Sequence, residues 1–580
     1  MDIFSVLTLI GGLALFLYGM DLMGSGLKKL AGGQLEVILG KLTSTRIKGF
    51  LLGLFVTAAI QSSSATIVMV VGFVNSGIMK LAQTTGIILG ANIGTTVTAW
   101  ILSLTGINGS STWINLLKPE SFTPVLAVIG VLFTMFSESD KRKNVGSILI
   151  GFAILMYGMK AMSSMDDTEM FSQTLMKFSN PVMAIIIGTV LTAIIQSSSA
   201  SVGILQALSL TTAIPFSLAV PIIFGQNLGA AITPILSALS GNVNAKRVAA
   251  VGLYVKLFSV IAVAIVFYIL NGVFDFAFMS QNVNVVTIAI VHTAFNVIST
   301  FVILPFCRPI ENLAKKTIRG KEEENDKFAT LDDRFLSVPS FAVEKCKALV
   351  FDMAEITRKS VLQSTNLITA FDKNEYKEIL ASEGEVDRYE DKTSAYLVKI
   401  SGREMNTQDS RAVTQLLHVV GDIERISDHA VNIAKAAREM DEKGIVFSDS
   451  AKNDIKIITD AVRDVLNLTI DSFIADNSDK AKKVEPLDEV IDKLRYKIKD
   501  NHIKRLRDGD CTVEMGFILS DLLSNYERVS GHCSNIALSL LNPDADIVEP
   551  HKYMHHVKED IDNGYSKRYK EYKEKYSLKK

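Results

Sequence analysis

Two copies of one polar pentapeptide interrupt the apolar first half of this chain. The sequence QSSSA occurs at Gln61–Ala65 and again at Gln196–Ala200, and apolar residues flank each copy. Serine hydroxyls and glutamine oxygens can coordinate a hard cation such as sodium, while hydroxyls and free backbone N–H groups can bind an oxyanion. Because polar side chains are costly in hydrocarbon, a cluster of this kind is typical of a functional site.

Two other interpretations of these serines have to be weighed. Small serines in membrane helices often only permit close packing of helices. That interpretation would compete evenly for a single copy, but two copies in register favour a site. A serine nucleophile is not supported, because neither motif has a G-x-S-x-G turn or a neighbouring His–Asp arrangement. We therefore expect a protein that is not an enzyme.

The elements around the motifs are apolar runs of two lengths, which extend as far as Phe306. Several approach the ~20 residues that a helix needs to cross ~30 Å of hydrocarbon, and others are shorter. Short apolar segments that end at polar breaks indicate re-entrant hairpins or discontinuous helices. The sequence predicts an all-α, polytopic protein of the lipid bilayer, in which broken helices carry both motifs.

An internal repeat relates the two motifs. Gln61 and Gln196 lie 135 positions apart, and this offset also aligns GANIG at Gly90–Gly94 with GQNLG at Gly225–Gly229. The same offset pairs Gly53 with Gly188, Thr57 with Thr192 and Thr98 with Thr233, while Gly12–Met23 resembles Gly151–Met162 at an offset four residues larger. We predict a duplicated membrane domain with halves of 1–137 and 145–306.

The positions of Lys and Arg predict how the halves are oriented. Basic residues occur at Lys141–Lys143, at Lys246–Arg247 and from Arg308 onward, whereas Asn271–Asn282 contains none. Basic connections favour the cytoplasmic side of a membrane. This places the C-terminal half in the cytoplasm, with its cysteines reduced, and makes the repeat inverted. Inverted repeats put the substrate site near the midplane, where interrupted helices of both halves meet.

The doubled motif together with GANIGTT and GQNLGAA resembles the type II sodium/phosphate cotransporter family, specifically its bacterial members. The resemblance covers residues 1–306 and implies sodium-driven uptake of inorganic phosphate across the bacterial inner membrane, with Na+ as the coupling ion and no nucleic acid as a partner. It also implies a substrate- and sodium-binding core and supporting positions. The core comprises Gln61, Ser62, Ser63, Ser64, Gln196, Ser197, Ser198 and Ser199, and the supporting positions are Asn92 and Asn227.

A charge argument agrees with cation coupling. Neither motif contains Arg or Lys, so bound cations would have to balance a buried phosphate. Lys256, inside an apolar run, is the competing counter-charge, although a snorkelling lysine is the simpler interpretation. His292, in the sequence HTAFN, resembles a motif of the last family helix and is interpreted as a packed helix histidine.

The chain becomes charged and helical after a linker at 307–337. Six amphipathic helices are predicted from apolar residues at three- and four-residue spacing. ERISDHAVNIA at Glu424–Ala434 returns as ERVSGHCSNIA at Glu527–Ala537, so we expect two three-helix bundles, 338–440 and 450–542. The charged tail, 543–580, receives no role.

The C-terminal half resembles PhoU-like domains, which regulate phosphate uptake. In that family an acidic signature on a helix can bind a divalent metal, and here Asp422, Glu424 and Asp428 are the candidate ligands. Glu424 and Asp428 stand one turn apart on one helix face. Surface ion pairs are the alternative interpretation. Gly531 replaces the aspartate in the second copy, which argues against a second, equivalent metal site.

Two other functions stay open from the sequence. The membrane half could be a phosphate sensor that no longer transports, or it could export phosphate or carry another small anion. Whether the chain forms a homo-oligomer is left open as well.

Overall fold

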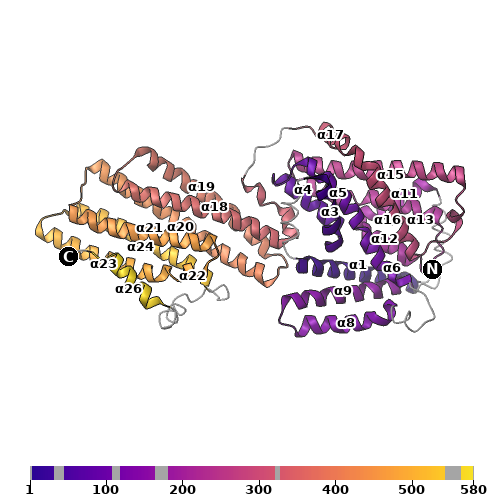
Figure 1. Cartoon of the computed structure of the whole chain (residues 1–580), viewed down its shortest axis with the longest axis horizontal. Helices are drawn as coiled ribbons and strands as arrows, with labels where there is room; N and C mark the ends of the chain where they lie inside the picture. The colour runs from indigo at the N-terminus through magenta and orange to yellow at the C-terminus, as the bar shows by residue number, and fades with distance from the viewer. Residues whose placement is uncertain are drawn as a thin grey trace. The chain divides into compact units, whose positions relative to one another are not determined.

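The computed structural model describes residues 3–31, 45–106, 118–163, 180–320, 327–541 and 564–578. The chain divides into two compact units, Met1–Phe341 and Ala342–Lys580 (Figure 1). Within the described residues both units are helical, and the only β-type pairing is an isolated bridge between Pro215 and Asn282. The prediction of an all-α protein is confirmed.

The first unit contains long helices and short helices in the arrangement that the apolar runs predict. Its α-helices are α1 Ile3–Ala31, α3 Arg46–Ile60, α4 Ser63–Asn75, α5 Leu81–Gly94, α6 Thr96–Ser103, α8 Pro119–Phe136, α9 Asp140–Met162, α11 Pro181–Ile195, α12 Ser198–Leu208, α13 Phe216–Gly229, α14 Ile232–Ala238, α15 Val243–Phe274, α16 Val285–Ile303 and α17 Cys307–Thr317. Six segments among the described residues are long and apolar enough to span a membrane. The short apolar helices include α4, α11 and α12, which flank the two motifs.

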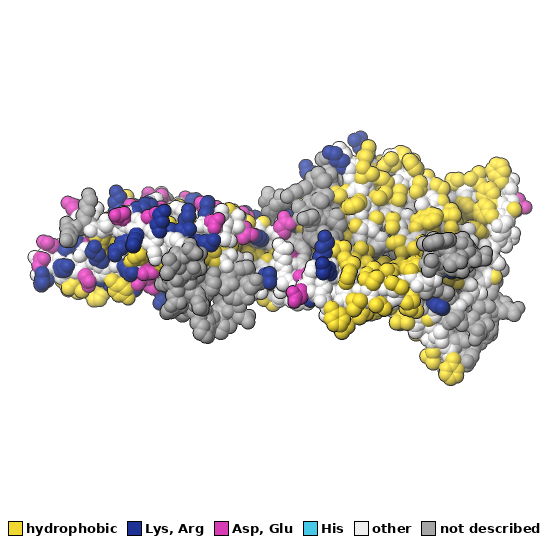
Figure 2. Space-filling view, turned by 60° about the horizontal axis from the view of Figure 1, so that its bottom comes forward, with side chains coloured by type: hydrophobic (Ala, Val, Ile, Leu, Met, Phe, Trp, Pro, Cys, Tyr) yellow, Lys and Arg dark blue, Asp and Glu magenta, His cyan; other side chains and the backbone are white. Residues whose placement is uncertain are grey.

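The surface of the first unit is apolar, as a lipid-facing surface must be. Large hydrophobic side chains such as Phe55, Phe136, Ile194 and Phe301 are exposed. Figure 2 shows hydrophobic side chains over much of the visible face of this unit, with few charged ones among them. A soluble protein would hide a patch of this size, so the first unit is a membrane domain.

Helices α1 and α9 pack against each other through glycines. A Cβ atom on Gly12 would lie 2.8 Å from the Met162 nitrogen, and one on Gly151 would lie 2.5 Å from the Met23 nitrogen. Similarly, Gly19 meets Leu155. The pair runs antiparallel, because early residues of α1 meet late residues of α9. Only glycine permits helix axes to come this close.

The beginning of the predicted linker is a helix that belongs to the membrane domain. Glu311 of α17 is buried, accepts a hydrogen bond from the Thr85 hydroxyl at 2.8 Å and pairs with Arg46 at 3.2 Å. Burying a carboxylate requires such partners, and these fix α17 to α3 and α5. The first part of the predicted linker, Cys307–Thr317, is therefore packed on the membrane domain.

The second unit is built from long amphipathic helices. Its α-helices are α18 Pro339–Leu367, α19 Lys373–Ser401, α20 Thr407–Lys443, α21 Asp449–Ile474, α22 Ser478–Ala481, α23 Val484–Asp508, α24 Val513–Leu541 and α26 Tyr565–Lys575. The six long helices α18–α21, α23 and α24 match the six predicted ones. Helix α20 begins where the Asn406 side chain accepts from the Asp409 N–H at 2.8 Å, and it ends at Gly444, whose φ is 62°. These are the usual start and stop signals of a helix.

The tail contains a helix that lies on the second bundle. Tyr565 of α26 donates to Glu489 at 2.6 Å, and Lys493 lies 4.4 Å from the ring centre of Tyr569. Lys575 pairs with Asp464 at 2.6 Å. The remainder of the predicted tail, 543–563 and 579–580, lies outside the described residues.

Candidate functional site

The first motif lies at a break between two helices. Helix α3 ends at Ile60, Gln61 takes a left-handed conformation with φ 59°, and α4 begins at Ser63. The Ser62 hydroxyl accepts a hydrogen bond from the Ala65 N–H at 3.2 Å and so caps α4. A left-handed glutamine is strained, and such strain is found where a site requires it. The break leaves the first N–H groups of α4 unbonded within the helix.

The second motif repeats this geometry. Gln196 has φ 60°, and the Ser197 hydroxyl accepts from the Ala200 N–H at 3.2 Å at the start of α12. In the described part of the chain only two other non-glycine residues have positive φ, and neither lies in a motif. The same sequence therefore produces the same broken helix in both halves.

Glycines hold each broken helix against a neighbouring helix. A Cβ atom on Gly53 would lie 2.3 Å from the Ile87 oxygen, and one on Gly90 would lie 1.9 Å from the Phe50 oxygen. The equivalent Gly188 and Gly225 approach the oxygens of Ile222 and Ile185 to 2.3 and 2.0 Å. The pairs α3–α5 and α11–α13 are thus tightly packed scaffolds, which explains the glycines of GANIG and GQNLG.

The structure brings the two motifs together. The Ser64 hydroxyl of the first motif donates to the Gln196 carbonyl of the second at 3.4 Å. Thr98 donates to the Gln61 side-chain oxygen at 2.7 Å, and the equivalent Thr233 donates to the Gln196 carbonyl at 3.3 Å. Two interrupted helices from opposite halves of the chain therefore meet at one place.

The core residues differ in exposure. Ser63, Ser198 and Ser199 are buried, Gln61, Ser62, Ser64 and Ser197 are half-buried, and Gln196 is exposed. No residue of either motif is charged. Positive potential comes instead from the N-termini of α4 and α12, which carry about half a unit charge each. The site can hold an anion at the helix ends and cations at the hydroxyl and carbonyl oxygens.

The two asparagines lie on the scaffold helices and not in the breaks. Asn227 is buried and donates to the Ile223 carbonyl of its own helix at 3.0 Å. Asn92 is half-buried in α5. Asn227 thus has a local structural partner, in keeping with a supporting role.

His292 and Lys256 form a second polar region between α15 and α16. Both side chains are buried. Within the described residues neither ring nitrogen of His292 has a hydrogen-bond partner. Neither residue is linked to the motifs by a hydrogen bond that the structure shows.

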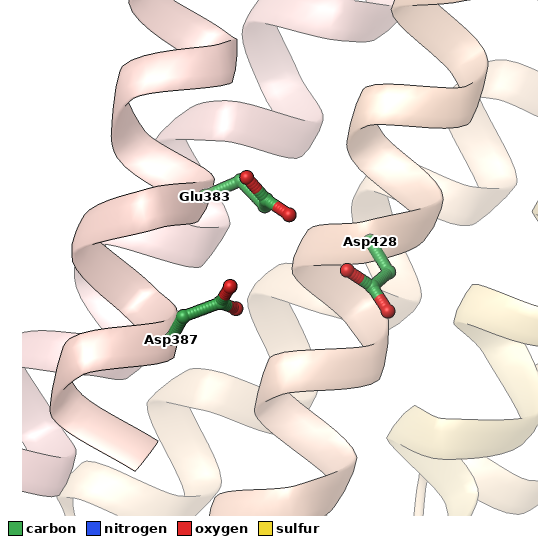
Figure 3. Close-up of side chains that lie close together, drawn as sticks. All are labelled: Glu383, Asp387 and Asp428. Atoms are coloured by element: carbon green, nitrogen blue, oxygen red, sulfur yellow. The ribbon is translucent and has the colours of Figure 1, made fainter. Parts of the chain in front are cut away.

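Three carboxylates gather on the first bundle of the C-terminal unit. Glu383 and Asp387 of α19 point toward Asp428 of α20, and one ligand oxygen from each lies within 4.8 Å of the others (Figure 3). Burial, and then the neighbouring carboxylates, raise the pKa of Glu383 and of Asp387 above the ordinary range. A hard or borderline cation would relieve this repulsion, so the residues fit a metal.

This cluster differs from the predicted ligand set. Of the three predicted ligands, only Asp428 is one of the three clustered carboxylates. Glu424 is a neighbour of Asp428, and its pKa is raised first by burial and then by the charge of Asp428. Asp422 does not belong to the cluster, because its carboxylate lies 2.8 Å from the His532 ring on α24. Sequence reasoning missed Glu383 and Asp387, although they show the same one-turn spacing as Glu424 and Asp428.

The second bundle neutralises its acidic face with its own side chains. Arg495 lies 3.0 Å from Asp492 and 3.5 Å from Glu527, which is the repeat equivalent of Glu424. Ser530 donates to Asp488 at 2.5 Å, and burial raises the pKa of Asp488 to about 6. Among the described residues only the first bundle has a three-carboxylate cluster, which agrees with the replacement of Asp428 by Gly531 in the repeat.

The interrupted apolar helices, six candidate spans and the helical C-terminal unit define a polytopic membrane protein of the transporter class. The chain belongs to the Na+/Pi-cotransporter family, which it matches over residues 15–164 and 167–298, and it carries a PhoU domain matched over residues 350–437 and 455–540.

Three relatives show how far the similarity extends. A protein named for inorganic phosphate export, YjbB of Salmonella typhimurium, is 22% identical over 93% of this chain and 98% of its own length. The uncharacterized protein YqeW of Bacillus subtilis is 30% identical over 53% of this chain and 96% of its own length. The sodium-dependent phosphate transport protein 2A of Rattus norvegicus is 35% identical over 17% of this chain and 15% of its own.

Part of this chain is also similar to a solved structure. PhoU from Pseudomonas aeruginosa is 20% identical, covers 34% of this chain and 95% of its own, and gives a TM-score of 0.33. The PhoU assignment rests on the family match over the two bundles.

Proposed function

We propose that the protein is a sodium-coupled transporter of inorganic phosphate that works by alternating access. The observation that carries the proposal is the meeting of two interrupted helices, from the two halves of the membrane domain, at Ser64 and Gln196. Gln61–Ser64 and Gln196–Ser199 bind phosphate and sodium, while Asn92 and Asn227 stiffen the scaffold. Family membership supports phosphate as the substrate.

Charge balance supports the coupling to sodium. Phosphate brings one to two negative charges into a site whose motifs have no positive side chain. Two helix N-termini offset only part of that charge. Sodium ions that enter with phosphate supply the remainder, so the loaded site is far less costly to bury than phosphate alone.

We infer that the two halves form an inverted repeat. Gly12 and Gly19 of α1 are the sequence equivalents of Gly151 and Gly158 of α9, and these two helices pack antiparallel. The contact between Gly12 and Met162 returns as the contact between Gly151 and Met23, which is the pattern of a two-fold axis perpendicular to the helices. An axis of that kind lies in the membrane plane and reverses one half relative to the other.

The basic connections support a cytoplasmic location for the PhoU domain in a bacterial cell. There the first bundle binds a divalent metal at Glu383, Asp387 and Asp428, and the domain regulates transport in response to phosphate. Support for the metal comes from the three converging carboxylates.

Phosphate uptake into proteoliposomes tests the main proposal. The purified protein is reconstituted, and radiolabelled phosphate is followed with an inward sodium gradient, with an equal choline gradient and with sodium on both sides. Accumulation that requires the sodium gradient is the expected result. Accumulation that ignores sodium, or no flux in either direction, contradicts the proposal. Competition by sulfate and arsenate defines the anion.

Export of phosphate is the second candidate. It is favoured by the likeness to YjbB, which spans 93% of this chain and is named for phosphate export. Vesicles loaded with labelled phosphate separate the two directions. Efflux that proceeds against an inward sodium gradient would support export, whereas efflux driven only by outward sodium would reflect the same symporter running in reverse.

A further inference from the structure

The two halves of the membrane domain differ at one buried polar position beside the motifs. In the first half the Thr57 hydroxyl donates to the Thr66 hydroxyl at 3.0 Å, and Thr66 donates to the Ser62 carbonyl at 3.0 Å. Both threonines are fully buried, and both are satisfied. The pair ties the end of α3 to the start of α4.

The equivalent pair of side chains in the second half does not form this hydrogen bond. Thr192 and Ser201 stand 135 positions after Thr57 and Thr66, and both are fully buried. Neither hydroxyl has a hydrogen-bond partner among the described residues. A buried hydroxyl without a partner costs about 1–3 kcal/mol, so two of them together need an explanation.

Beside Thr192 and Ser201, the side chain of a glutamine carries a third oxygen without a hydrogen-bond partner. Gln226 stands where the first half has Ala91, and it is 1% exposed. Its amide nitrogen donates to the Ser201 carbonyl at 2.9 Å, which joins α13 to α12. Its side-chain oxygen has no partner among the described residues.

The three side chains belong to one junction of α11, α12 and α13. A Cβ atom on Gly229, one turn after Gln226, would lie 2.8 Å from the Thr192 Cβ. A Cβ atom on Gly188, one turn before Thr192, would lie 3.1 Å from the backbone nitrogen of Gln226. Thr192 and Gln226 therefore lie along the same helix contact, and Gln226 reaches Ser201 from it.

We propose that Thr192, Ser201 and Gln226 form a buried sodium site that exists in the second half alone. The unpaired atoms are all neutral oxygens, which suit a hard cation. The Gln226 side-chain oxygen can only accept, so it would repel rather than bind an anion. No carboxylate takes part, so a divalent ion would lack the charge that its protein sites ordinarily supply. The site rests on the proposed sodium coupling and gives it a location beside the second motif.

Two variants test the site. Thr192→Val removes one hydroxyl and keeps the shape of the side chain. The double variant Ser201→Thr with Gln226→Ala gives the second half the residues of the first, where the hydroxyl pair closes on itself. Thr57→Val is the matched control, because its hydroxyl is already bonded to Thr66.

Sodium binding is measured first as thermal stabilisation of the detergent-solubilised protein, with choline chloride at equal ionic strength as the reference. The wild type should be stabilised by sodium. In both test variants the sodium concentration at half-effect should rise roughly three- to tenfold, as expected when one net hydrogen-bond-sized interaction is lost, whereas the control should match the wild type. The same shifts are expected in the sodium dependence of phosphate uptake by proteoliposomes.

The outcomes separate this site from the proposed function. Sodium-dependent uptake with unshifted variants would overturn the site, since a buried water or simple packing would then satisfy these oxygens, and would leave the transporter intact. Sodium stabilisation that shifts in the variants, without any sodium-dependent flux, would support the site and overturn the coupling. If sodium neither stabilises the wild type nor drives its uptake, both are overturned.

Discussion

At the scale of single residues, the site depends on two strained glutamines and the serines that follow them. Gln61 and Gln196 have left-handed backbone conformations, which end α3 and α11. Ser62 and Ser197 then cap the N-termini of the next helices, α4 and α12. The buried Ser63 and Ser198 come next, at the first position of each new helix. Their hydroxyls lie where a helix end offers N–H groups to an anion.

Ser63→Ala and Ser198→Ala should each reduce phosphate uptake strongly. Losing a hydrogen bond to a charged ligand costs about 1.5–3 kcal/mol, so uptake at low phosphate should fall roughly ten- to hundredfold. Initial rates in proteoliposomes, normalised to the reconstituted protein, measure the effect. Ser76→Ala and Ser209→Ala, at the opposite ends of the same two helices, are the controls and should transport normally. Normal uptake by both test variants would remove the site assignment.

Asp387→Asn and Asp428→Asn should abolish divalent metal binding by the PhoU domain. Titration of the metal-free full-length protein with manganese and zinc, followed by calorimetry, measures the affinity. Asp422→Asn is the matched control, since Asp422 contacts His532 and not the cluster. Because burial and the neighbouring carboxylates raise the pKa values of Glu383 and Asp387, protons should compete with the metal at a higher pH than they do at ordinary carboxylates, and the affinity should fall as the pH is lowered.

The same raised pKa values predict a stability effect. A carboxyl group with a raised pKa in the folded state loses stabilisation as the pH rises through that value, so the metal-free cluster destabilises the folded bundle at neutral pH. Metal should therefore raise the melting temperature of the wild type at pH 7 and have little effect on Asp387→Asn. A wild type that is indifferent to both metals would show that the cluster is only an acidic surface.

At the scale of elements, the tight helix pairs α3–α5 and α11–α13 position the breaks. Gly225→Ala should destabilise the membrane domain by about 1–3 kcal/mol, because its Cβ would lie 2.0 Å from the Ile185 oxygen and the helices would have to separate. Thermal unfolding in detergent measures the loss, and uptake should fall with it. Gly252→Ala in α15 is the control: nothing lies within 4 Å of its Cβ, so it should be neutral or slightly stabilising. Equal stability of the two variants would contradict the close packing.

The sequence predicted the helices well because their signals are local. Apolar runs, glutamine–serine breaks and three- and four-residue periodicity are all readable along the chain, and the six long helices of the PhoU domain follow the predicted ones. Contacts between distant elements were harder to predict. The glycines at Gly90 and Gly225 were aligned as a repeat, but nothing in their sequence showed that they meet the α3 and α11 backbones.

The predicted metal ligands illustrate the same limit. Asp422, Glu424 and Asp428 were grouped because they are neighbours on one helix. In the structure, Asp428 lies beside Glu383 and Asp387 of α19. Asp422 instead contacts His532 of α24. Helix faces can be read from spacing, whereas the faces that meet depend on the packing of the whole bundle.

At the scale of the whole molecule, the proposed inverted repeat predicts that the connection Asn271–Asn282 and the basic connection Lys141–Lys143 lie on opposite sides of the membrane. Asp275→Cys, in the connection without Lys or Arg, should react with a membrane-impermeant thiol reagent in intact cells. Arg142→Cys, in the basic connection, should react only after permeabilisation. The background from native thiols is small, since Cys307, Cys346 and Cys533 are buried and only Cys511 is partly accessible. Labelling of both variants from the same side would contradict the inversion.

The antiparallel glycine contact between α1 and α9 also bears on how such a protein could have arisen. Each of these helices carries the same glycine stripe, and each stripe is covered by the equivalent stripe of the other half. For a single-length ancestor, the equivalent contact would be made with a second copy of itself, inserted in the opposite orientation in the same bilayer. A present-day half-length chain of this kind would have to insert in both topologies and assemble as a dimer.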